Sequence, residues 1–181
     1  NKKGLIYLKK YMIIDTNIPM LDNYWYEGFK DYIIVIPFTV ISEIDKHKSD
    51  MGLLGINSRN MARLIGRIAE ESKGSIDGIV VMEEGKFILH LPHTSDQYED
   101  TKDLLDLTVN DDKIIYSALE IKTKHPECDV VLASNDCNVR SKVLYLYNKY
   151  KVDATTYNEN KGFKVGEYYK QNSYECSDDI L

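Results

Sequence analysis

Three short apolar runs dominate the chain and lie at residues 11–14, 32–36 and 129–133. None shows the apolar–polar alternation of a strand with one face in water. Runs of this kind are typical of strands buried on both faces of a parallel sheet. Residues 152–155 fit a last strand of the same sheet.

Helical periodicity fills the intervals between these runs. The clearest amphipathic pattern covers residues 57–73, where apolar side chains recur with the i, i+3, i+4, i+7 spacing of one helix face. Further helices are predicted at about 40–47, after Pro37, at 110–123, with Asn110 as the N-cap, and at 139–150. Residues 79–82 and 86–91 predict a hairpin around residues 83–85.

The order of these elements predicts the fold class. Strands that alternate with helices favour a three-layer α/β/α sandwich with a mostly parallel central sheet. Residues 1–156 are expected to form one domain with a good core. From Tyr157 onward the chain is polar with little periodicity, so residues 157–181 are interpreted as a tail or linker.

Composition narrows the class of protein. A net charge of −6 and a pI near 5.3 argue against a non-specific nucleic-acid coat, although acidic metal ligands would leave a nuclease compatible with them. No apolar run is long enough to span a membrane, and no signal peptide is evident. The cysteines form no CxxC pair, which favours reduced thiols in a cytoplasmic protein.

Acidic residues gather where the apolar runs end. They fall in four short patches at residues 13–17, 40–45, 110–114 and 132–138. Parallel sheets place their sites beyond the carboxyl ends of the strands, where Asp15 and Asp136 are expected. Asp111 or Asp112, in the first turn of a helix, can reach the same edge. Clustered carboxylates repel and favour a hard cation, Mg²⁺ or Mn²⁺, which indicates a phosphodiesterase centre.

Each acid also has a structural reading. Asp15 and Asp136 suit turns, Asp111 and Asp112 suit the positive end of a helix dipole, and Glu43 suits a solvated helix face. The patches share small polar neighbours that favour a joint site, because such side chains can hold ligands in place. These neighbours are Thr16, Asn17, Ser42, Asn110, Ser134 and Asn138.

Basic and aromatic residues supply candidates for RNA contact. Arg140 and Lys142 follow Asp136 closely, and Lys46 follows Glu43; all three cations are candidates for binding phosphate. An arginine stripe on the predicted 57–73 helix fits either a solvated face or an RNA backbone. The aromatic cluster at residues 24–26 fits either core packing or base stacking.

The acidic motifs, in their order and spacing, resemble those of the PIN domain family of metal-dependent ribonucleases over about residues 11–155. The resemblance implies an acidic quartet that is both catalytic and metal-binding, formed by Asp15, Glu43, Asp111 and Asp136. Asp112 is the adjacent alternative to Asp111 and a further metal-ligand candidate. Asn17, Ser134 and Asn138 would support the ligands. The implied activity is endo- or exonucleolytic hydrolysis of single-stranded RNA that leaves a 5′-phosphate and a 3′-hydroxyl.

The stretches at residues 43–48 and 135–142 look most like PIN domains fused to PhoH-type ATPases. No P-loop motif occurs in this chain, so the ATPase half is absent from it. The resemblance and the polar segment after Tyr157 together suggest a PhoH-type ATPase domain C-terminal to this one in the same protein. The chain is also compatible with a homo-oligomer.

Two other functions fit an α/β domain of this kind: a catalytically inactive PIN-fold module that binds RNA or protein, and a receiver-like phosphoacceptor domain. The complete quartet argues against the first, and the single Asp after the first strand argues against the second.

Overall fold

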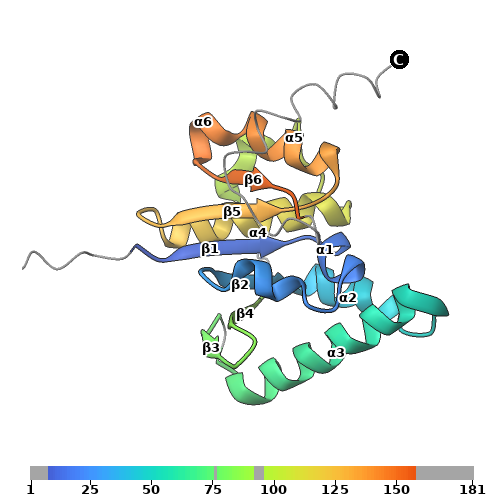
Figure 1. The fold of residues 1–181 in the computed structure, drawn as a ribbon. Helices are drawn as coiled ribbons and strands as arrows, with labels where there is room; N and C mark the ends of the chain where they lie inside the picture. Colours follow the sequence, from blue (N-terminus) through green and yellow to red (C-terminus); the bar gives the residue numbers. More distant parts are fainter. Residues whose placement is uncertain (1–7, 76, 92–95, 158–181) are drawn as a thin grey trace, which may run out of the picture.

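A six-stranded sheet forms the centre of the computed structural model, which describes residues 8–75, 77–91 and 96–157 (Figure 1). The strand order is β3-β4-β2-β1-β5-β6. Neighbouring strands are parallel except β3 and β4, which form the expected antiparallel hairpin with Gly85 at positive φ. The strands are β1 (Lys10–Ile14), β2 (Ile33–Pro37), β3 (Val80–Val81), β4 (Lys86–His90), β5 (Asp129–Ala133) and β6 (Asp153–Thr155).

Helices complete a three-layer α/β/α fold, so the fold class predicted from the sequence is confirmed. The α-helices are α1 (Asn17–Leu21), α2 (Phe38–Lys46), α3 (Gly52–Ser72), α4 (Asn110–Lys124), α5 (Cys137–Tyr145) and α6 (Tyr147–Tyr150). Two 3-10 helices that the sequence did not predict are η1 (Trp25–Phe29) and η2 (Asp96–Thr101).

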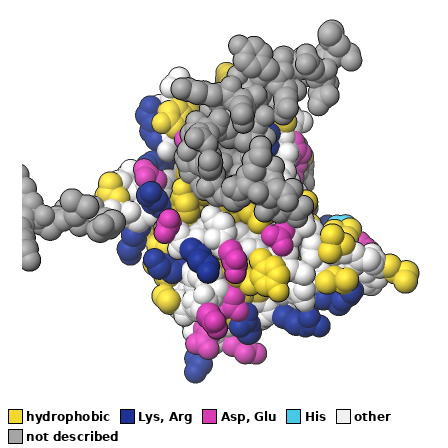
Figure 2. Space-filling model, in the orientation of Figure 1, with side chains coloured by type: hydrophobic (Ala, Val, Ile, Leu, Met, Phe, Trp, Pro, Cys, Tyr) yellow, Lys and Arg dark blue, Asp and Glu magenta, His cyan; other side chains and the backbone are white. Residues whose placement is uncertain are grey.

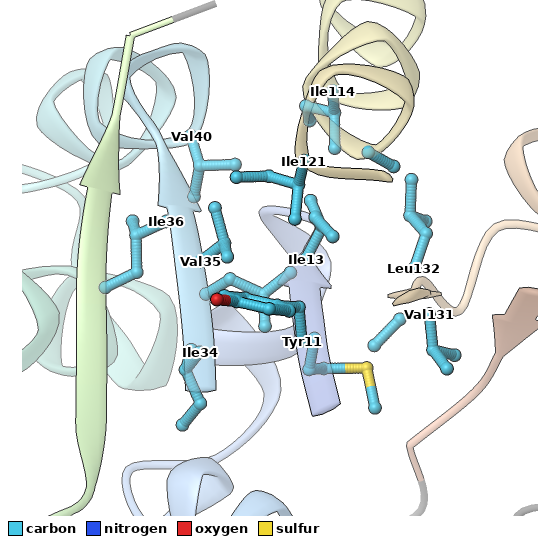
Figure 3. Close-up of a cluster of buried hydrophobic side chains, with 14 of the residues drawn as sticks. Tyr11, Ile13, Ile34, Val35, Ile36, Val40, Ile114, Ile121, Val131 and Leu132 are labelled. Carbon is cyan, nitrogen blue, oxygen red and sulfur yellow. The ribbon is translucent and has the colours of Figure 1, made fainter. Parts of the chain in front are cut away.

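The core lies between the central strands and the helices that cover them. Ile13 of β1 and Val35 of β2 face Val40 of α2 and Ile114 and Ile121 of α4 (Figure 3). All of β2 and four of the five residues of β1 are buried, which explains why these strands read as continuous apolar runs. Burial of aliphatic side chains on this scale is the main force that holds the helices to the sheet.

The topology places a switch point of the strand order at the carboxyl end of β1. This strand lies between β2 on one side and β5 on the other, so the chain leaves β1 in one direction and later returns to its opposite side. Such switch points form the ligand-binding crevices of open α/β sheets. Asp15 follows β1 directly, and Ser134 follows β5 in the neighbouring position.

Three helix boundaries differ from the sequence prediction. Helix α3 begins at Gly52 rather than Asn57, because its first turns carry exposed apolar side chains that hide the amphipathic period. The helix expected at 139–150 is interrupted at Leu146, which separates α5 from α6. Asn110 is not an N-cap: Val109 holds that position, and the Asn110 amide is used elsewhere, as described below.

The end of the described chain differs in part from the expected tail. Tyr157 is buried, packs on Phe29 and donates a hydrogen bond to Asp22 (2.8 Å). It therefore contacts the domain, whereas residues 158–181 lie outside the described residues. Among the described helices, none has the length and apolar content needed to cross a bilayer.

The prediction of reduced cysteines agrees with the structure at one cysteine and differs from it at another. Cys128 is free and buried, as expected. Cys137 is disulfide-bonded. Cys176 lies outside the described residues.

Candidate metal centre

Asp15 is buried at the carboxyl end of β1, with only 4% of its surface exposed. Its Oδ2 accepts hydrogen bonds from the Ser134 hydroxyl (2.5 Å) and the Asn17 amide (2.9 Å), and its Oδ1 accepts one from the backbone N–H of Thr16 (2.6 Å). Three donors on one carboxylate fix its position at the end of β1.

Asp136 begins helix α5 at the end of the neighbouring strand. Its Oδ1 accepts the backbone N–H of Asn138 (2.7 Å), so it is the N-cap of the helix. Its own N–H donates to the Ser134 hydroxyl (3.0 Å), which in turn donates to Asp15. Ser134 therefore links the two acids, as its proposed supporting role requires, while Asn138 contributes through its backbone.

Glu43 reaches the same place from helix α2. The Thr16 hydroxyl donates to its Oε2, and the Asn110 amide donates to its Oε1 (2.9 Å). Asn110 therefore joins the second patch to the third instead of capping α4. Ser42, the other polar neighbour expected here, donates to the Phe38 carbonyl of its own helix (3.0 Å) and takes no part.

Asp111 and Asp112 have different environments although they are adjacent. Asp112 is 2% exposed, and both of its oxygens are engaged: Oδ1 by the Lys142 ammonium (2.6 Å) and Oδ2 by the backbone N–H of Asp106 (2.8 Å). Asp111 is half-buried, and within the described residues its carboxylate accepts no hydrogen bond. These contacts favour Asp111 as the third acid and a structural role for Asp112.

Burial and neighbouring charges make the cluster electrostatically unfavourable. Burial is the main cause that raises the pKa of Asp15 from 3.8 to about 6, with smaller contributions from Asp111 and Glu43. The pKa of Asp111 is also raised, first by burial and then by Asp136 and Glu43. Repulsion among clustered carboxylates acts in the direction expected, although burial contributes more than repulsion to both raised pKa values.

A divalent cation would relieve this accumulation of negative charge. Across the described residues, no three Asp, Glu, His or Cys side chains form a ready-made metal-holding group. The donor set still fits a hard cation, because the acids nearest one another offer carboxylate oxygens and raise one another's pKa values. Asp15, Glu43, Asp111 and Asp136 are the side chains that would hold it.

The cations proposed to bind phosphate are largely engaged within the protein. Arg140 donates to the Ser134 carbonyl (2.7 Å), and Lys142 pairs with Asp112. Both side chains point back onto the domain from α5 and stabilise the ends of the acidic patches. Lys46 is exposed in the last turn of α2.

Two residues that support the site were missed by the sequence analysis. The Asn135 backbone N–H donates to the Asn17 carbonyl oxygen Oδ1 (3.0 Å), and its side-chain oxygen accepts from Tyr157 N–H (2.9 Å). Asp106 N–H anchors Asp112. Asn135 stood inside a recognised motif, but its partner Tyr157 lies in a segment interpreted as tail, and the backbone donor at Asp106 has no signature in the sequence.

The N-cap role of Asp136 leads to a stability prediction. Without divalent cations, Asp136→Asn is expected to unfold at nearly the parental temperature, because asparagine caps helices as well as aspartate does. Asp136→Ala should lose about 1 kcal/mol, the typical value of a cap. Thermal melts in EDTA test this pair, and equal stability of the two variants would show that the cap contributes nothing.

Comparison with known proteins agrees with this geometry. A family model described as PIN domain matches residues 12–146, well over half of the chain. The chain belongs to the PIN domain family. Members of this family are typically nucleases, generally with divalent metals. The resemblance recognised in the acidic motifs is therefore confirmed at the level of the family.

A curated relative supports the finer resemblance. The chain is 29% identical over 140 residues to Protein PhoH2 of Bacillus subtilis (strain 168). This similarity covers 75% of the chain but 31% of the relative, so the chain spans less than a third of that protein. The suggestion of a PhoH-associated PIN domain agrees with this match.

Proposed function

We propose that this PIN domain hydrolyses phosphodiester bonds of single-stranded RNA at a Mg²⁺ or Mn²⁺ centre held by Asp15, Glu43, Asp111 and Asp136. One observation carries the proposal: direct hydrogen bonds and an ion pair connect all four acidic patches. Ser134 joins Asp15 to the fourth patch, and Thr16 and Asn110 join Glu43 to the first and third. The ion pair between Lys142 and Asp112 joins the third patch to α5, the helix that Asp136 caps.

The chain's own residues would prepare this centre before RNA arrives. Asp15 and Glu43 are held by two or more donors each, so little ordering would be needed when they bind a ligand. A bound divalent cation supplies activation of water and stabilisation of charge on the phosphate and leaving oxygen. Within the described residues, no histidine or lysine forms a hydrogen bond or ion pair with Asp15, Glu43, Asp111 or Asp136, so none of them is held there as a general base.

The proposal is tested by RNA cleavage with the purified chain. A fluorescent single-stranded RNA should be cut in Mg²⁺ or Mn²⁺ and left intact in EDTA. Asp15→Asn and Asp136→Asn should lower the rate by about a hundredfold or more, since they remove oxygens that would hold the cation.

The matched control is Asp129→Asn, which changes an exposed aspartate at the amino-terminal end of β5, the end opposite to the acids. It should cleave like the parent. Equal cleavage in EDTA, or full activity of folded Asp15→Asn and Asp136→Asn, would refute the assignment. RNA binding with no cleavage under any metal condition would favour the alternative, a non-catalytic RNA-binding module.

The larger protein context is a second proposal. We propose that a PhoH-type ATPase domain follows this domain in the same protein, which is supported by the similarity to a relative more than three times as long as the matched region. The complete reading frame tests it: a P-loop motif downstream is expected, and termination near Leu181 would refute it.

A further inference from the structure

A groove lies outside the metal centre, between α3 and the segment formed by the end of α1 and η1. It has a volume of about 350 Å³, and its lining combines the aromatic residues Tyr24, Trp25 and Tyr26 with Asn57, Arg63 and Arg67 of α3. In the space-filling view, Lys and Arg side chains lie among hydrophobic, Asp and Glu side chains over the lower part of the molecule, where α3 runs (Figures 1 and 2).

The floor of this groove contains an unsatisfied polar atom. Asn57 is 1% exposed, and its amide nitrogen donates to the Met20 carbonyl (2.7 Å). That bond fixes the orientation of the amide, because a carbonyl cannot accept from an oxygen without a hydrogen. The remaining oxygen, Oδ1, is buried with no hydrogen-bond partner. Leaving such an acceptor unpaired is costly, so the groove is suited to a ligand with an N–H donor.

The rim of the groove offers a stacking surface and a positive charge. Tyr24 is 64% exposed and is held edge-on against Tyr26 (6.5 Å between ring centroids). Arg63 donates a hydrogen bond to the Asn60 side-chain oxygen (2.8 Å). Because the asparagine is neutral, this bond does not neutralise the positive charge of the arginine. Arg67 is paired with Glu84, and Asp22, which also lines the groove, accepts hydrogen bonds from Tyr24 N–H and the Tyr157 hydroxyl.

We propose that this groove binds one nucleotide of the RNA, with its base on Tyr24 and against Asn57 and its phosphate at Arg63. Single-stranded RNA is bound by stacking of unpaired bases on aromatic side chains, by hydrogen bonds to base edges and by basic groups along the backbone. Every RNA base carries an N–H donor for Asn57, so the groove tolerates different sequences. The inference rests on the proposed function for the identity of the polymer.

The position of the groove relative to the metal centre supports this assignment. Helix α1 connects the two: its first residue, Asn17, donates a hydrogen bond to Asp15, while Pro19 in its middle and Asp22 just after its last residue line the groove. The helix has five residues and is therefore about 7.5 Å long. An RNA strand with one nucleotide in the groove would place a neighbouring phosphate near the acids.

The experiment uses Trp25, the single tryptophan of the chain, as the reporter, because it lines the groove. The full chain in EDTA is titrated with an unstructured oligoribonucleotide, with AMP and with ribose 5-phosphate, while anisotropy of labelled RNA is read in parallel. The oligonucleotide and, more weakly, AMP should change Trp25 fluorescence saturably. Ribose 5-phosphate should not do so at the same concentrations.

Two variants test the rim. Tyr24→Ala and Arg63→Ala should each weaken oligonucleotide binding about tenfold. Their matched controls are Tyr145→Ala, an exposed tyrosine of α5, and Arg59→Ala, an arginine one turn earlier on α3 that bonds the Lys48 carbonyl. Both controls should bind like the parent. Parental affinity of Tyr24→Ala and Arg63→Ala by both readouts would overturn the inference.

The floor is tested without mutating the buried asparagine. Purine riboside 5′-phosphate lacks the 6-amino group of AMP and should bind more weakly; equal binding of the two nucleotides would remove the role of Asn57.

Failure of the groove inference and failure of the proposed nuclease function give different results. If RNA is cut in Mn²⁺ but the groove variants bind normally, the groove inference fails alone. If RNA binds through the groove but is never cut, the proposed nuclease function fails alone.

Discussion

In EDTA at neutral pH, Asp15→Asn is expected to be more stable than the parent, although it removes a buried hydrogen-bonded side chain. Asp15 has a pKa of about 6 in the folded domain against an ordinary value of 3.8. The folded state therefore holds the proton more tightly than the unfolded state, and ionisation costs the parent about 3 kcal/mol above pH 6. Weaker hydrogen bonds from Ser134 and Asn17 offset part of the gain, which leaves about 1–2 kcal/mol.

The pH dependence separates this electrostatic effect from packing. The energetic cost of ionising Asp15 is absent below its pKa in the unfolded chain and complete above its pKa in the folded domain. The free energy of unfolding of the parent, relative to that of Asp15→Asn, should therefore fall as the pH rises from about 4 to about 6. Chemical denaturation at several pH values measures the difference, with Asp129→Asn expected to follow the parent. A difference between Asp15→Asn and parent that stays constant from pH 4 to 7 would contradict the raised pKa.

Asp111→Asn and Asp112→Asn should have opposite effects on activity and stability. Asp111 is half-buried beside Asp136 and Glu43, so its neutralisation should preserve folding but reduce RNA cleavage by about a hundredfold. Asp112→Asn should leave Lys142 without its partner and weaken the Asp106 contact, at a cost of about 1–3 kcal/mol.

Thermal melts in EDTA test the predicted effects on stability, and cleavage rates in Mn²⁺, measured on the same preparations, test the predicted effects on activity. The expected pattern is a stable, inactive Asp111→Asn and a destabilised Asp112→Asn that retains activity while folded. Loss of cleavage in folded Asp112→Asn, with full activity in Asp111→Asn, would transfer the metal-binding role to Asp112.

The sheet could be predicted from the sequence because its strands have a local signature. Strands such as β1 and β2 are buried along nearly their whole length, so each appears as an uninterrupted apolar run. Helix α3 shows the limit of this reasoning. Leu53, Leu54 and Ile56 in its first turns are exposed, and apolar residues on the solvent side erase the period that marks a helix.

The acids of the site were visible in the sequence, but the contacts between them were not. Asp15 and Asp136 follow neighbouring parallel strands, so their proximity follows from topology. The bond from Thr16 to Glu43 depends on how α2 packs, which no local pattern encodes. Proximity in sequence can also mislead. Arg140 and Lys142 follow Asp136 closely, yet their side chains bond the Ser134 carbonyl and Asp112.

Direct measurement of Mn²⁺ binding tests the central claim, that the four linked acidic patches form one metal centre. Electron paramagnetic resonance of free Mn²⁺ during titration should show binding to the parent and to Asp129→Asn. The Asp15→Asn/Asp111→Asn double variant, confirmed to be folded, should lose that binding. Equal Mn²⁺ affinity in the parent and the double variant would contradict the account.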